Sequence, residues 1–569
     1  MKLVYSYHTF IFPFIWKTYF KVNNRRDFKD IKAIFKHNAV WADDDLSKEY
    51  WHQIEIDEDA TATGGLNENK LKYATYQYFQ PTIRDAIFGE ENDSNTKEVV
   101  QSYSFKPIKN DQGKSSKRAK YIIQKQINDK DKRYNLDLAD IKLRLYNTGV
   151  GLLAFVCENR ENTTLADVKN INDYGRRITL PFIPDSSNIN DSLCADSITI
   201  SWDGMEDTIK QDFRTHIISF NNKSNVLEDN PKMSHIADFV KEILNYSSGK
   251  SESSWQFTTN RQHNKNDKFW YIQPALDDRM FVMCAVNKNY QDLFWKGLSC
   301  SPFEYLSTLQ SWQLGSSKKK PFNYEELEKS FYEFIFCDPA GKCSCSFGQM
   351  RQQLINEHLY YRWLHPTDGT LYCVAAQAFM CVSDVNYIIN YFRTIYYELA
   401  CLVLVQRVSL RVLQNEASYL SAHLEDKDNK VNKGSRRDIA NLQEKLIAFQ
   451  NQINLYEISS QEQAIELYDM MREVFMVNKH TSILQEQLNG LYNIANIHQN
   501  EAFSHLAGTI AMIALIVALP SFINDFAFFP AEWHIGEEKG FEGYGGIILI
   551  VKIILAIIIW RIIYNMWKE

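Results

Sequence analysis

The 569-residue sequence has little glycine and proline, no regular cysteine framework and no excess of positive charge. With 22 glycines and 13 prolines it is not a collagen-like or linker-like chain, and 45% hydrophobic residues exclude wholesale disorder. Its 63 basic and 70 acidic side chains give a formal charge of −7, so we expect no direct binding of nucleic acid. Ten cysteines without regular spacing fit a reducing compartment better than a disulfide framework.

The common catalytic and metal-binding motifs are also missing. The sequence contains no P-loop, no G-x-S-x-G and no H-E-x-x-H, so we expect no enzyme. The alternative is an enzyme whose active site is formed by Asp and Glu residues that are scattered in the sequence and meet only in the folded chain. Cys337, Cys343 and Cys345 lie close together, with His358 and His365 downstream, but they lack the paired C-x-x-C spacing of a zinc site. No metal-ligand set is therefore certain, and we interpret these cysteines as structural thiols.

Two long apolar runs are present near the C-terminus. Leu506–Phe522 has 17 residues without a charge, and Gly545–Tyr564 has 20 residues that include Lys552 and Arg561. A membrane-spanning helix needs about 17–25 predominantly apolar residues. The alternative is a buried soluble hairpin, but runs such as IILIV and ILAIIIW offer no polar face to water. We therefore predict two transmembrane helices in a lipid bilayer, at 504–523 and 545–564.

The charges beside these runs predict their orientation. Arg561 and Lys568 lie at the far end of the second run, whereas the connector at 524–544 holds five acidic residues and one lysine. Positively charged residues favour the cytoplasmic side. We therefore expect an inner (plasma) membrane protein with an outer loop at 524–544, a tail at 565–569 and both termini in the cytoplasm. Lys552 either extends to the near interface or has a role in permeation.

The first 369 residues contain short β-branched and aromatic runs, such as DSITISW and RMFVMCAV, between clusters of Asn, Asp, Gly and Pro. This pattern predicts an α/β (α+β) cytoplasmic domain at 1–369 that senses a ligand. The opening MKLVYSYHTFIFPFIW lacks the features of a signal peptide and is expected to form strand. The sequence GVGLLA at 149–154 matches a dinucleotide turn, but its flanks favour a hairpin of two strands.

From residue 370 onward the sequence favours long helices. Thr370–Lys433 and Ser435–Asn489 contain no glycine or proline, and apolar residues recur there at three- and four-residue steps. We predict a helical stalk at 370–503. Ile395–Val405 is too short to span a membrane and contains a glutamate, so we expect a buried helix there. The pattern from about Ser460 predicts one continuous helix into the first span, roughly 60 residues and 90 Å long.

Two membrane helices per chain cannot enclose a water-filled path, so a pore would require a homo-oligomer. Thr509, Met512 and Ile516 share one side of the first predicted span, and we expect them to line a lumen that closes by excluding water. Helix packing is the alternative. At the outer end, polar side chains could gather hydrated cations or could simply end the helix: Asn524 in the pore, with Asp525 and Glu532 in an outer acidic ring.

Two basic clusters are candidate ligand sites. Arg176 and Arg177, in YGRRITLPF, offer guanidinium groups that can bind a phosphate, or they could cap a strand edge against solvent. Lys117 and Arg118 belong to a longer basic stretch. That stretch could bind a polyanion or inner-leaflet lipid, or form an ordinary solvated face.

The architecture resembles the CorA-like divalent cation transporters, in which a cytoplasmic α/β domain leads into a long helix that becomes the first of two C-terminal spans. That family ends the first span in Gly-Met-Asn and continues to an outer loop with Met-Pro-Glu-Leu. The corresponding residues here are Phe522, Ile523 and Asn524, then Phe529, Pro530, Ala531 and Glu532. Only the asparagine and a Pro/Glu similarity remain, so the resemblance implies the topology and leaves magnesium selectivity open.

More narrowly, KLVYSYHTFIFPF, LRLYNTGVGLLAF and the degenerate outer motif resemble the CorA-like membrane effectors of type III CRISPR systems. This resemblance implies a pentamer that responds to a nucleotide messenger, an S-adenosylmethionine–AMP conjugate, and acts on the membrane in antiviral defence. It implies no cofactor beyond a possible divalent cation. A housekeeping divalent-cation (Mg, Co or Ni) transporter and a membrane-anchored binding scaffold without a pore are the alternatives.

Overall fold

The structure is a computed structural model that describes residues 4–22, 25–27, 51–53, 74–88, 99–105, 119–127, 130–178, 193–202, 208–213, 237–245, 256–258, 269–276, 278–287, 324–360, 370–383, 386–422, 435–526 and 561. These residues form two compact units. The first comprises Met1–Glu416 with Leu442–Gln485, and the second comprises Ala417–Asn441 with Glu486–Glu569. The predicted mixed α/β class is confirmed, with a large sheet in the first unit and a long helix at the end of the described chain.

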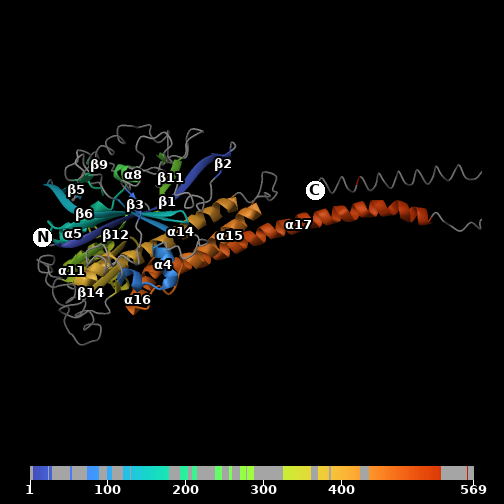
Figure 1. The fold of residues 1–569 in the computed structure, drawn as a ribbon. Helices are drawn as coiled ribbons and strands as arrows, with labels where there is room; N and C mark the ends of the chain where they lie inside the picture. The colour runs from blue at the N-terminus through green and yellow to red at the C-terminus, as the bar shows by residue number, and fades with distance from the viewer. Residues whose placement is uncertain are drawn as a thin grey trace, which may run out of the picture. The chain divides into compact units, whose positions relative to one another are not determined.

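Strand β1 lies in the middle of one large mixed sheet, between β12 and β7. Figure 1 shows this sheet with the helices around it. Along its main path the strands follow the order β13-β14-β15-β12-β1-β7-β6-β5-β8-β9. The strands are β1 (Ser6–Val22), β2 (Arg25–Asp27), β3 (Trp51–Gln53), β4 (Val100–Phe105), β5 (Ala119–Ile127), β6 (Lys130–Tyr146), β7 (Val150–Asn159), β8 (Ser197–Trp202), β9 (Thr208–Asp212), β10 (Gln256–Thr258), β11 (Phe269–Pro274), β12 (Phe281–Asn287), β13 (Leu359–Tyr360), β14 (Thr370–Ala375) and β15 (Ala378–Ser383).

The described helices differ widely in length. They are α4 (Pro81–Phe88), α5 (Leu165–Gly175), α8 (Asp238–Asn245), α11 (Tyr324–Phe336), α12 (Gly348–Glu357), α13 (Asn386–Arg393), α14 (Ile395–Ala422), α15 (Ser435–Gln452), α16 (Glu462–Val474) and α17 (Val477–Phe526).

Alternating side chains of β1 build the core on one face of the sheet. Phe10, Phe12, Phe14 and Trp16 are fully buried, and they pack in one cluster with apolar side chains of α5, α8 and α11. Successive strand residues point to opposite faces, which places these four residues together. The prediction that the opening sequence forms strand is therefore confirmed, and it supplies the centre of the core.

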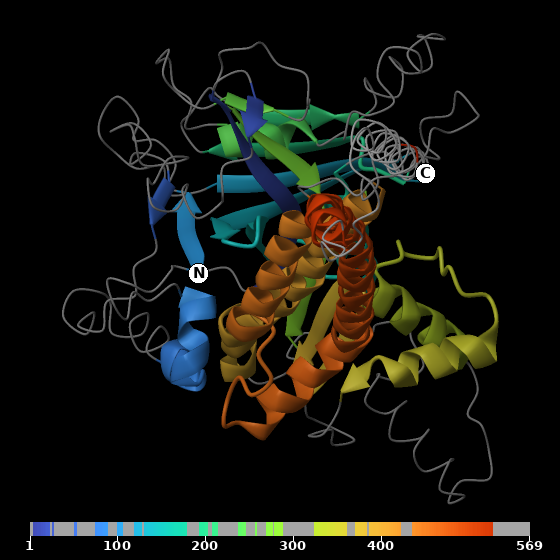
Figure 2. The same cartoon turned by 90° about the vertical axis from the view of Figure 1, so that its right-hand side faces the viewer.

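Helix α14 packs on the opposite face of the sheet (Figure 2). Arg144 of β6 donates from Nη1 and Nη2 to Glu398 of α14, with 2.7 Å between Nη2 and Oε1, and both side chains are buried. Lys142 lies with its Nζ 4.7 Å from the ring centroid of Tyr397. A buried, two-point ion pair fixes the helix at this position because separating the partners would leave a charge without water.

Among the described residues, Tyr387–Ala422 is the one helical stretch both long and apolar enough to cross a membrane. However, 78% of its most apolar window is buried inside the protein. This burial confirms that Ile395–Val405 belongs to a buried helix. A shorter apolar helical stretch covers Ser504–Leu515, within the first predicted span. The second predicted span lies outside the described residues, apart from Arg561, which is helical and exposed.

The prediction of long helices starting at residue 370 is wrong for the first part of that region. Residues Thr370–Ala375 and Ala378–Ser383 form the antiparallel strands β14 and β15. All of their residues are buried, and β15 pairs with β12. The sequences TLYCVA and AFMCVS are continuous apolar runs, and such runs of about six residues suit a strand that is covered on both faces.

The helix predicted to run unbroken from about Ser460 is interrupted. Helix α16 ends at Val474 and α17 begins at Val477, with Met476 between them at a φ of 54°. No glycine or proline marks this break, so the periodic pattern continues through it. From Val477 the helix does continue for 50 residues, about 75 Å at 1.5 Å per residue.

The 149–154 segment forms the predicted hairpin, because β6 and β7 are antiparallel and Gly149 adopts a φ of 83° in the turn between them. Gly151 then allows close approach to β1. A Cβ atom at Gly151 would lie 2.2 Å from ring atoms of Phe14. Such a distance cannot be accommodated without movement of the ring or the strand.

We predict that Gly151→Ala lowers the free energy of unfolding of the first unit by about 1–3 kcal/mol, because it overpacks the Phe14 site. Urea unfolding followed by tryptophan fluorescence measures this change. Gly490→Ala is the matched control, since a Cβ there meets nothing within 4 Å and the residue belongs to the second unit. Equal effects of the two variants on this transition would contradict the overpacking argument.

Candidate functional site: an arginine–aspartate network at the end of α5

Helix α5 is buried on almost every side although half of its sequence is polar. The helix reads LADVKNINDYG, begins after Thr164, whose side chain accepts from the backbone N–H of Asp167, and buries nine of its eleven residues. Buried polar groups need hydrogen-bond partners, because an unpaired one loses its hydration without compensation. The partners of α5 therefore show what this helix holds in place.

The middle of α5 is joined to α11 and to the loop that follows α11. Lys169 donates to Glu333 and, over 3.0 Å, to the Ser330 hydroxyl. Asn170 Oδ1 accepts the backbone N–H of Ala340 at 3.1 Å. The N–H of Gly341 donates to the same Glu333 carboxylate at 3.2 Å. These contacts hold one side of α5 against the α11–α12 loop.

A histidine of β1 is joined to the other side of α5. His8 is fully buried, with Nδ1 2.7 Å from Asn172 Oδ1 and Nε2 2.8 Å from Ser6 Oγ. Burial lowers the pKa of His8 to about 4, and the hydrogen bond to Asn172 opposes this shift only partly. The imidazole is therefore neutral near pH 7, and it links β1 to α5 without adding charge.

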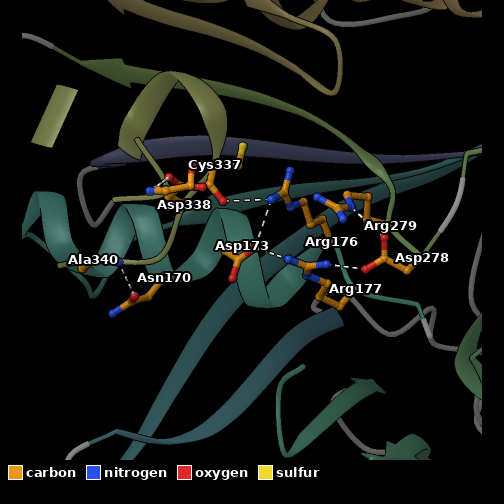
Figure 3. A network of polar contacts seen from close by, with 10 residues as sticks. Asn170, Asp173, Arg176, Arg177, Asp278, Arg279, Cys337, Asp338 and Ala340 are labelled. Atoms are coloured by element: carbon orange, nitrogen blue, oxygen red, sulfur yellow. Dashed lines mark hydrogen bonds and ion pairs between the residues drawn. The ribbon is translucent and has the colours of Figure 1, made fainter. Parts of the chain in front are cut away.

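The C-terminal end of α5 carries a network of opposite charges (Figure 3). Asp173 Oδ1 accepts from Arg176 Nη2 at 3.0 Å and from Arg177 Nη2 at 3.1 Å. Arg177 also donates to Asp278, which in turn accepts from Arg279 Nε at 2.8 Å. The backbones of Arg177 and Arg279 also pair, in an isolated antiparallel bridge. Arg177 and Asp278, which are 101 positions apart in the sequence, are thereby brought into one site.

Ion pairs join three guanidinium groups and two carboxylates in this network, and the carboxylate of Asp338 lies close enough to interact electrostatically with Arg176. Several of its buried polar atoms have no hydrogen-bond partner within the described part of the chain: Nε and Nη1 of Arg176, Nε of Arg177 and Oδ2 of Asp173. Arg176 and Arg177 are only 2% and 4% exposed. Unused guanidinium donors suit an anionic group such as a phosphate or carboxylate.

The carboxylates keep the network ionised. Burial alone would lower the pKa of Arg177, but the charges of Asp173 and Asp278 raise it above its ordinary value. Burial would likewise raise the pKa of Asp278, yet Arg177 and Arg279 hold it below its usual range. Each group thus stabilises the charged form of its neighbour.

Of the predicted ligand residues, Arg176 and Arg177 are brought together in this network, and Lys117 and Arg118 lie outside the described residues. The alternative in which the two arginines cap a strand edge against solvent is wrong, because both are buried. Sequence reasoning missed Asp173 and Asp278. The spacing of Asp173 three and four residues before the arginine pair was the available signal.

The predicted pore residues lie on or beyond α17. Thr509 and Met512 are half-buried, and Thr509 Oγ1 donates to the carbonyl of His505 at 2.6 Å. The remaining positions are Ile516, Asn524 and Asp525, which are helical but whose side chains are outside the description, and Glu532, which lies beyond the described residues. Within the described part of the chain, no group of three or more His, Cys, Asp or Glu residues could hold a metal ion.

We predict that the first unit loses stability as the pH falls from about 6.5 to about 4. The unfolded chain binds a proton at His8 in this range while the folded chain does not, so the contribution is complete above pH 6.5 and lost below pH 4. The loss attributable to His8 is about 3 kcal/mol. Urea unfolding at several pH values should give a flatter profile for His8→Gln, whereas His480→Gln, at an exposed position of α17, should keep the original slope.

Comparison with known proteins gives little likeness. No known protein family matches the chain, and no curated protein matches it. Among solved structures, "The complete structure of CorA magnesium transporter from Methanocaldococcus jannaschii" is similar over 50% of this chain and 91% of that chain, at 11% identity and a TM-score of 0.21.

Proposed function

We propose that the chain is a subunit of a CorA-like homo-oligomeric membrane channel or transporter that is gated by an anionic nucleotide ligand and performs no catalysis of its own. The observation that carries this proposal is α17. Its C-terminal turns are apolar, and within this chain they expose Leu506, Ile510, Ile513 and Leu515 by 53–61%. Uncovered aliphatic side chains on successive turns favour lipid or another helix over water.

The oligomer follows from the same helix. A single helix satisfies its own backbone and encloses nothing, so an aqueous path requires several copies around an axis. In such a ring, Thr509, Met512 and Ile516 would face the lumen and Asn524 its outer end. Asp525 and Glu532 would surround the mouth and attract divalent cations. The resemblance of the sequence to CorA-like proteins supports five subunits, two spans per chain and cytoplasmic termini in the inner membrane.

The ligand arm of the proposal rests on the arginine–aspartate network. Arg176 and Arg177 offer buried, unused guanidinium donors, which suit a phosphate group. The resemblance to type III CRISPR effectors supports an S-adenosylmethionine–AMP conjugate as this ligand and antiviral defence as the role. The ligand would gate the pore by binding one arrangement more tightly, about 1.4 kcal/mol for each tenfold preference.

The flux experiment described below distinguishes the proposed function from two others, a housekeeping divalent-cation transporter and a membrane-anchored scaffold. Asn524 occupies the last turn of α17, as a selectivity asparagine would in a housekeeping divalent-cation transporter. Such a transporter would conduct without any nucleotide. A membrane-anchored scaffold would bind its ligand and conduct nothing.

We predict that the full chain in proteoliposomes changes its divalent-cation flux when the S-adenosylmethionine–AMP conjugate is added. Arg176→Gln should weaken binding of this conjugate at least tenfold in calorimetry, because a charge-assisted hydrogen bond contributes about 1.5–3 kcal/mol. Arg393→Gln is the control, since Arg393 pairs with Glu158 away from the network. Flux that ignores the conjugate would favour the housekeeping transporter, and binding without flux would favour the scaffold.

We predict that Met512→Asp makes the closed channel leaky, because a ring of carboxylates would hydrate an apolar lumen. Flux from proteoliposomes without ligand measures the leak, and Ile513→Asp, at the next and more exposed position of α17, controls for a general loss of insertion. If Met512→Asp assembles and conducts like the original chain, this side of α17 does not face the lumen.

A further inference from the structure

The α11–α12 loop, residues 337–346, is held at both ends by buried arginines. Arg176 Nη2 donates to the carbonyl of Cys337 at 2.8 Å, and Arg351 Nη1 donates to the carbonyl of Cys345 at 2.9 Å. Asp338 Oδ2 accepts the backbone N–H of Ser344 at 2.7 Å and closes the loop on itself. The first of these anchors is the same arginine that offers unused donors to an anion.

The Cys337 anchor is formed by a strained residue. Cys337 adopts a φ of 58°, and the N–H of Asp338 donates to the carbonyl of Glu333 at 2.9 Å, as in the left-handed cap that ends many helices. Glycine is usual at this position because a Cβ is sterically unfavourable there. The strained cap therefore lowers the cost of releasing the loop, and Arg176 opposes the release.

Arg176 divides its donors unequally. Its Nη2 donates both to the carboxylate of Asp173 at 3.0 Å and to the neutral carbonyl of Cys337, whereas Nε and Nη1 have no hydrogen-bond partner among the described residues. Both bonds have a cationic donor, but only the bond to Asp173 also has an anionic acceptor, so it is the stronger of the two. An anion that binds at Nε or at Nη1 and displaces the guanidinium would therefore break the contact with Cys337 before the contact with Asp173.

We propose that the contact between Arg176 and the Cys337 carbonyl is a ligand-operated latch, and that an anion at Arg176 releases the α11–α12 loop. This inference rests on the proposed ligand site and adds the element that first responds to it. Helix α11 packs on β14 and β15, so a freed loop changes the end of a helix that lies against the sheet. Cys337 is a positioning residue, since it acts through the arginine.

The reactivity of Cys343, which lies in the loop, can be used to measure release of the loop. Among the nine described cysteines, Cys343 alone is not buried, and its Sγ donates to the carbonyl of Cys345 at 3.3 Å. Its rate of alkylation by a maleimide, measured on its own peptide by mass spectrometry in the full chain, therefore follows the opening of the loop.

The test compares Cys337→Gly with Cys337→Ala. Both variants remove the thiol, but only glycine relieves the left-handed strain, so alkylation of Cys343 should be about fivefold slower in Cys337→Gly than in Cys337→Ala. Equal rates would overturn the latch, whether or not any ligand binds. Met476→Gly with Met476→Ala, at the other described left-handed residue that is not glycine, should leave the rate at Cys343 unchanged.

The ligand-dependent arm uses the S-adenosylmethionine–AMP conjugate as probe, with binding measured separately by calorimetry. Saturating probe should accelerate Cys343 alkylation in the original chain and much less in Cys337→Gly, in which the closed loop is favoured. Binding without any change at Cys343 would overturn the latch and leave the proposed function standing. Absence of binding would contradict the proposed ligand, and the comparison of glycine with alanine would then decide on the latch alone.

Discussion

The burial of charge on both faces of one sheet is the constraint on which the first unit depends. On one face, Asp173 accepts from two arginines at the end of α5, and on the other, Glu398 holds Arg144 of β6. Removing one partner of a buried pair costs several kcal/mol, because the remaining charge keeps its desolvation without compensation. The helices that carry these carboxylates therefore cannot shift independently of the sheet, and any ligand that alters the pairing acts on the packing of a whole helix.

Local sequence patterns were sufficient for much of the fold. The aromatic and apolar opening sequence predicts a strand, and the flanks of the glycine-containing turn at 149–154 predict the hairpin; both are present. The sequence pattern gave the wrong secondary structure where pairing with a distant strand determines it. Strands β14 and β15 lack any glycine or proline boundary before α13, and only their pairing with β12 distinguishes them from helix. The break at Met476 is also invisible in the apolar periodicity, which continues through it.

The candidate site also contains residues that could be predicted from the sequence and residues that could not. The adjacent pair Arg176 and Arg177 was recognisable as a candidate site, because guanidinium groups offer donors that can bind a phosphate. Asp278 was not, since it lies about a hundred residues away and reaches the site through the backbone bridge between Arg177 and Arg279. The sequence of α5 is rich in polar residues and gives no sign of burial, and only the surrounding sheet and loops show that these residues are partners of buried groups.

The two described non-glycine residues with left-handed backbone each follow a helix, Cys337 after α11 and Met476 after α16. The side chain of Cys337 is fully buried in the core, which offsets its strain, whereas Met476 is 52% exposed and gains little by burial. The junction before α17 must therefore be held by its neighbours. Arg472 does this by donating to Asn454 Oδ1 at 2.9 Å and to Asn478 Oδ1 at 2.6 Å. Because these acceptors are neutral amides, the start of α17 is fixed by weaker bonds than those that fix α14, and it is the less costly of the two helices to reorient.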